Sequence, residues 1–86
     1  MNIRSWISGC PFKKGHEYRI KRDFVSLRDS FKKNEIVVFN YCAHSTYDGY
    51  HGFFFDVPNS GRLLTWDLPY NEDIEIWKDY FKAVEK

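Results

Sequence analysis

Phe12-Lys13-Lys14-Gly15 and its near repeat Phe31-Lys32-Lys33-Asn34 are the two stretches that decide the fold of this chain. Each copy has an aromatic residue, two lysines and a residue that reaches positive φ at low cost, glycine in the first copy and asparagine in the second. Each copy also leads into a β-prone stretch, Glu17-Tyr18-Arg19-Ile20 or Glu35-Ile36-Val37-Val38-Phe39. We therefore expect two equivalent units, each with an anchoring aromatic residue, an exposed basic turn and the start of a strand.

Further strands are predicted by the alternation of apolar and polar residues and by the turn signals between them. The predicted strands are residues 16–22, 35–42, 51–57 and 62–68. Asp48-Gly49 and the Pro-Asn-Ser-Gly run at 58–61 have strong turn chemistry and separate the later strands. The stretch 23–30 is interpreted as a long loop with one helical turn. This pattern predicts an antiparallel meander. Closure of the meander into a barrel would remove its exposed edges.

The period of the sequence changes near the C-terminus. Ile74, Trp77, Phe81 and Val84 recur at steps of three and four residues, which is the spacing of one helix face. Asn71 is a candidate N-cap ahead of an acidic first turn. The spacing predicts a helix over residues ~72–84 that covers an open end or face of the sheet.

The composition is that of one small domain. We expect a lead-in over residues 1–11, a β-barrel over residues 12–68 and a C-terminal helix over residues 69–86. With 86 residues the chain needs large side chains for its core, and it has 3 Trp, 6 Tyr and 8 Phe. The net charge is +1, but residues 1–34 carry nine Lys and Arg against three Asp and Glu, whereas residues 35–86 carry four against nine. The two halves therefore carry opposite charge.

A family resemblance follows from the order of these motifs. Phe12-x-x-Gly15-x-x-Tyr18 comes first, then Phe31-x-x-x-Glu35-Ile36, then Tyr47-Asp48 and finally Trp66. The order resembles that of small SH3-like β-barrels and, more narrowly, that of a bacterial family of small domains of unknown function, over residues 12 to about 81. The resemblance implies a mainly β fold: a small SH3-like antiparallel barrel of about five strands with a C-terminal α-helix. It implies no activity.

The aromatic residues at strand ends predict a binding surface. In SH3-like barrels, rings in these positions line a groove for extended or proline-rich peptides, because such a ligand is already ordered. The predicted ligand-binding residues are Tyr41, Tyr47, Tyr50 and Trp66, with Asp48 as a polar orienting group. We therefore expect a non-enzymatic binding module for a protein or peptide partner.

Two other functions stay open on the sequence. The basic residues of the N-terminal part would form a nucleic-acid-binding stripe if the two basic turns lay side by side. These residues are Lys13, Lys14, Arg19, Lys21, Arg22, Lys32 and Lys33. The pI of about 7.8 argues against a dedicated nucleic-acid binder. The third possibility is a structural or assembly role through a strand edge or the C-terminal helix.

The sequence predicts no catalytic residues, metal or cofactor. Cys42-Ala43-His44 places a thiol and an imidazole on one side of a strand, but paired zinc-ligand spacings do not occur. The glycines stand apart, so there is no phosphate-binding loop. No apolar run is long enough to predict a membrane span. Cys10 and Cys42 are expected to be reduced, in a cytoplasmic protein.

Overall fold

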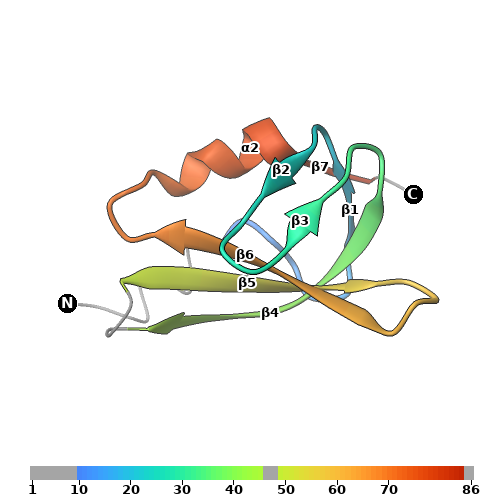
Figure 1. Cartoon of the computed structure of the whole chain (residues 1–86), viewed down its shortest axis with the longest axis horizontal. Coiled ribbons are helices and arrows are strands. Elements are labelled where there is room, and N and C mark those ends of the chain that lie inside the picture. Colours follow the sequence, from blue (N-terminus) through green and yellow to red (C-terminus); the bar gives the residue numbers. More distant parts are fainter. Residues whose placement is uncertain (1–9, 46–48, 85–86) are drawn as a thin grey trace.

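The structure is a computed structural model that describes residues 10–45 and 49–84 (Figure 1). The elements in chain order are β1 (Glu17–Ile20), β2 (Phe24–Val25), β3 (Ser30–Phe31), β4 (Ile36–Ser45), β5 (Tyr50–Val57), β6 (Arg62–Pro69), the 3-10 helix η1 (Ile74–Ile76), the α-helical turn α2 (Trp77–Tyr80) and β7 (Phe81–Ala83). Five strands form one antiparallel sheet in the order β6-β5-β4-β1-β7, and β2 pairs with β3 in a separate hairpin. The mainly β prediction is confirmed.

The two repeated units form as the sequence predicts. Phe12 and Phe31 are buried in the core, and the lysines that follow each of them are exposed. Gly15 and Asn34 have φ values of 82° and 73°. The Gly15 amide donates to the Phe39 carbonyl at 2.8 Å, and the Asn34 amide donates to the Ile20 carbonyl at 2.7 Å. Each positive-φ residue therefore fastens its turn to a neighbouring strand, at Phe39 within β4 or at Ile20 at the end of β1.

The core lies on one face of the sheet. Along β5, Phe53, Phe55 and Val57 point inward, and along β6 the inward residues are Leu64, Trp66 and Leu68, as period two requires. The Phe12 ring lies among them, with its centroid within 5.5 Å of the ring centroids of Phe39, Phe53 and Phe55. The ring of Phe12 thus fills the centre of the core.

A β-bulge in β4 changes which side chains face the core. Phe39 lies opposite Phe55, but Tyr41 lies opposite Phe54, so Asn40 is the extra residue. Without the bulge, Tyr41 would share the inner face with Phe39. The side-chain Nδ2 of Asn40 donates to the Asp56 carboxylate at 3.0 Å and ties the bulge to β5. As a result Tyr41 faces outward and Cys42 faces inward.

The segment predicted as a long loop is instead the β2–β3 hairpin. The Ser26 amide donates to the Asp29 carbonyl at 2.8 Å and closes its turn. Phe24 and Phe31 stack across the two strands with centroids 4.6 Å apart and planes 5° from parallel. The ring of Phe24 also packs against Tyr80 of α2 at 4.5 Å. The hairpin therefore covers the core beside the helical turn, as Figure 1 shows.

The helix predicted over residues ~72–84 is wrong in its extent. Helical structure runs from Ile74 to Tyr80, and the capping side chain is that of Asp73, which accepts from the Glu75 amide at 2.9 Å. Phe81 is extended, with φ −127° and ψ 148°, and its ring enters the core. Strand β7 follows and pairs with β1. Pairing with β7 satisfies the backbone groups on the outer edge of β1, which a continued helix would leave without a partner. This long-range pairing overrides the helical spacing of the apolar residues.

The sheet is open rather than a closed barrel in the part of the chain that the structure describes. Its two edges are β6 and β7, and no strand pairing joins them among these residues. The predicted closure is therefore not found. No helix within residues 10–45 and 49–84 is long and apolar enough to cross a membrane.

Candidate functional site

Two aromatic side chains stand on the outer face of the sheet, away from the core. The rings of Tyr41 and Phe54, on β4 and β5, stack with centroids 4.4 Å apart and planes 7° from parallel. Tyr41 is 48% exposed and Phe54 is half-buried. We call this pair the aromatic platform. A stacked pair on a regular sheet is held by its neighbours, so its apolar surface is already arranged for contact.

Gly52 gives the ring of Phe54 room to lie over the sheet. A Cβ atom at this position would come within 3.3 Å of a Phe54 ring carbon, closer than an ordinary van der Waals contact. The glycine thus suits the close approach of the ring, because a larger residue here would push the Phe54 ring aside. Ala43 lies opposite Gly52 on β4, so two small residues adjoin the aromatic platform.

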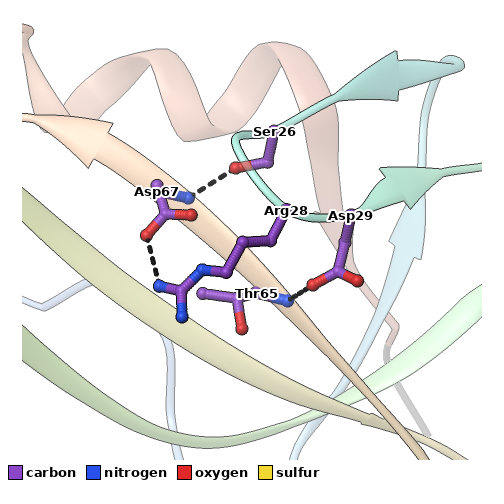
Figure 2. A network of polar contacts seen from close by, with 5 residues as sticks. All are labelled: Ser26, Arg28, Asp29, Thr65 and Asp67. Carbon is purple, nitrogen blue, oxygen red and sulfur yellow. Dashed lines mark hydrogen bonds and ion pairs between the residues drawn. The ribbon is translucent and has the colours of Figure 1, made fainter.

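A polar network lies on β6 next to this position (Figure 2). The Arg28 guanidinium, from the β2–β3 turn, pairs with the Asp67 carboxylate at 3.0 Å. The Asp67 side chain is 3% exposed, whereas that of Arg28 is 61% exposed. Asp67 is also the residue opposite Gly52. On the outer face, the aromatic platform is therefore followed by the exposed guanidinium of Arg28, whose carboxylate partner is buried.

Two side chains of the same turn protect the β6 edge (Figure 2). The Thr65 amide donates to the Asp29 carboxylate at 2.8 Å, and the Asp67 amide donates to the Ser26 hydroxyl at 2.7 Å. These are amides on the side of β6 that faces away from β5. Side chains of the hairpin thus take the place of a further strand.

The predicted ligand-binding residues fall in different places. Tyr41 is on the aromatic platform, and Tyr50 is half-buried on the same face of β5 as Phe54 by period two. Trp66 is 4% exposed and packs against Phe53 in the core, so its ring is not part of an outer surface. Tyr47 and Asp48 lie outside the described residues.

Three residues of this surface were missed by the sequence reasoning: Phe54, Arg28 and Asp67. Phe54 had a usable signal, because the middle residue of Phe53-Phe54-Phe55 must face away from its two neighbours in a strand. The pairing of Arg28 with Asp67 had none, since these residues are distant in the sequence and meet through the hairpin.

The basic residues do not form one stripe. In the β1–β4 ladder, Glu17 lies opposite Val38 and Arg19 opposite Ile36, so the two basic turns are at opposite ends of the ladder. The turn at residues 13–14 adjoins the end of this ladder at Phe39, and the turn at residues 32–34 adjoins Ile20. The arrangement that the nucleic-acid hypothesis required is therefore absent from the described residues.

An open cleft of about 460 Å³ lies at the β7 edge of the sheet. It is lined by Arg19, Lys82, Ala83 and Val84. Arg19 and Lys82 are directly opposite each other in the β1–β7 ladder. Like charges in this relation repel. No ion pair joins either cation to a carboxylate within residues 10–45 and 49–84. An anionic group in the cleft would relieve this repulsion.

Among the described residues, no group of three or more His, Cys, Asp or Glu side chains is placed to hold a metal ion. The side chain of His44 lies outside the described side chains, and so does its position relative to Cys42. Cys10 and Cys42 are both free thiols and half-buried. Burial raises the pKa of the Cys10 thiol above its usual value, and burial together with the neighbouring Cys10 raises the pKa of Cys42 to about 11.

Comparison with known proteins shows a likeness in fold. No protein-family model matches the chain, and no curated protein matches it. The structure is similar to that of the integron cassette protein VCH_CASS4 from the mobile metagenome of Vibrio cholerae. The TM-score is 0.70 at 18% sequence identity, covering 86% of this chain and 87% of that chain. At this identity the likeness shows the fold alone.

Proposed function

We propose that this chain is a non-enzymatic binding module, a partly open relative of SH3-like barrels, that recognises an extended segment of a protein partner on its outer sheet face. The observation that carries the proposal is the stack of Tyr41 on Phe54, which holds apolar surface in water on a rigid sheet. Rings fixed in this way bind at low cost in conformational entropy. Arg28, next to the platform, adds an exposed cation that fits a backbone carbonyl or carboxylate of the partner.

A second candidate surface is the cleft at the β7 edge. Its two opposed cations, Arg19 and Lys82, favour an acidic segment, and the exposed Ala83 lies on the free edge of β7, where an added strand can pair. This surface would bind through charge, so its affinity would fall with salt. Binding to the aromatic platform would be far less sensitive to salt, which separates the two surfaces.

The test is selection of binders from a peptide library displayed on phage, followed by titration of synthetic peptides into 15N-labelled protein. We expect enriched peptides whose binding shifts the amide signals around Tyr41 and Phe54. Tyr41→Ala is expected to weaken binding tenfold or more, because the loss of a central aromatic contact typically costs 1–2 kcal/mol or more. The matched control is Val25→Ala, at an apolar residue that is 79% exposed on β2.

Two results would contradict the proposal. One is a set of enriched peptides that bind the Tyr41→Ala protein as well as the original. The other is an absence of enriched peptides together with salt-sensitive binding of a single-stranded oligonucleotide, which would favour the nucleic-acid alternative. If the Arg19→Gln, Lys82→Gln double variant abolished peptide binding and Tyr41→Ala did not, the binding surface would be the β7 cleft.

A further inference from the structure

The two cysteines of the chain meet in space although 32 positions separate them in the sequence (42 − 10 = 32). The two thiols are close enough that each affects the pKa of the other. Both thiols are free and half-buried, and both pack against the hydrophobic core. Neither thiol takes part in the proposed recognition surface. The pair therefore needs a separate explanation.

Two independent features of the fold bring the thiols together. The bulge at Asn40 turns Cys42 to the inner face, opposite Phe53. The ring of Phe12 contacts the ring of Phe53 with centroids 5.4 Å apart, which draws the segment that begins at Cys10 to the same place. The Cys10 thiol then donates to the Phe12 carbonyl at 3.6 Å. The position of each sulfur atom is thus fixed by the core and by the sheet register.

We propose that Cys10 and Cys42 form a paired oxidation site, at which a small-molecule disulfide such as oxidised glutathione drives formation of an intramolecular disulfide. This site is separate from the proposed binding function. Neighbouring thiols in a folded protein have a high effective concentration for each other, which favours the internal bond over two mixed disulfides.

The reaction is balanced by one molecule of oxidised glutathione. The Cys10 thiolate attacks one glutathione sulfur, so a Cys10–glutathione disulfide forms, the glutathione S–S bond breaks and the first glutathione leaves as a thiolate. The Cys42 sulfur then attacks Cys10, forms the protein disulfide and expels the second glutathione. The two protein thiols lose two electrons and two protons in total, and the oxidised glutathione takes them up and becomes two molecules of reduced glutathione.

The bond would tie the start of the described chain to the middle of β4. Phe12, two residues after Cys10, would then be held in the core by a covalent link as well as by packing. Such a link restricts the unfolded chain over a loop of more than 30 residues. We therefore expect the oxidised protein to melt on the order of 10 °C above the reduced protein.

The experiment is an equilibrium titration of the full chain with mixtures of reduced and oxidised glutathione at pH 8.5. Intact mass and peptide mapping identify the products. We expect one species, lighter than the reduced protein by two hydrogens and containing a Cys10–Cys42 peptide link. The same titration in urea supplies the reference, and the native chain should form the bond at a ratio of oxidised to reduced glutathione at least tenfold lower.

Single variants serve as controls for the pairing. Cys10→Ser and Cys42→Ser each leave one thiol, and both should stop at a stable glutathione adduct. The proposal is overturned if the native chain accumulates two glutathione adducts or linked dimers. It is also overturned if the native chain forms the internal bond no more readily than the chain in urea, because adjacency in the fold would then confer no advantage.

Discussion

Removal of the carboxylate that caps the β6 edge is the most direct test of this structure. Asp29 lies in the turn between β2 and β3, and its carboxylate accepts from the Thr65 amide at 2.8 Å. Thr65 is 4% exposed, so water does not easily replace the lost acceptor. In Asp29→Ala, a buried amide would be left without its partner.

The size of the effect follows from this burial. A buried amide that loses a charged acceptor costs about 2 kcal/mol, within a range of roughly 1–3 kcal/mol. A chain of 86 residues has a free energy of unfolding of roughly 4–13 kcal/mol. The variant should therefore lose a sizeable share of its stability. The expected decrease in melting temperature is roughly 8–16 °C.

The assay is urea denaturation followed by circular dichroism, with Asp23→Ala as the matched control. Asp23 accepts from the Lys33 amide at 2.7 Å, a bond of the same kind and nearly the same length, but in an exposed place. Water can replace that acceptor, so the control should lose no more than about 0.5 kcal/mol. Asp29→Asn keeps an acceptor oxygen and should recover part of the loss. Equal destabilisation of the Asp29→Ala and Asp23→Ala proteins would refute the reasoning.

Three further outcomes are expected. Phe12→Ala should lose about 3–5 kcal/mol, which is measured as a large decrease in the urea midpoint by circular dichroism; an unchanged midpoint would contradict the central position of this ring. Asn34→Gly should keep the urea midpoint nearly unchanged, whereas Asn34→Val should lose about 1–2 kcal/mol, because φ is 73° there; similar midpoints for the two variants would argue against the turn. In Cys10→Ser the charge and the hydrogen bond of the Cys10 thiol are gone, but burial still raises the pKa of Cys42. The rate at which iodoacetamide alkylates Cys42 should therefore increase about tenfold per pH unit between pH 7 and 9. A rate that does not depend on pH would be inconsistent with a protonated thiol.

Local chemistry made most of the fold predictable. The repeated units were predicted because Gly15 and Asn34 have the backbone freedom that their turns need. The strands after them were predicted because apolar residues alternate with period two. Leu64, Trp66 and Leu68 share one face for the same reason, and all three are buried. This alternation also shows why Trp66 belongs with the core and not with a binding surface.

Features that depend on long-range pairing were not predictable from the sequence. Nothing in the local pattern marks Asn40 as an extra residue, yet the bulge there decides which way Tyr41 and Cys42 point. Phe81 has a spacing that suits a helix, but the free edge of β1 draws it into a strand. Tyr41 was predicted as a ligand-binding residue from its place near a strand end, whereas its outward position, its stacking partner and the nearby Arg28 emerge only from the folded sheet.

The β6 edge of the sheet is covered by side chains of the β2–β3 turn and, among the described residues, the β7 edge is not, and this difference limits how copies of this chain can associate. Head-to-tail growth requires β6 of one copy to pair with β7 of the next. The Thr65 and Asp67 amides that β6 would offer are already bound by Asp29 and Ser26, and Pro69 has no amide hydrogen to give. In the part of the chain that the structure describes, this leaves β7 against β7 of a second copy. That contact is two-fold symmetric, so strand addition through β7 ends at a dimer.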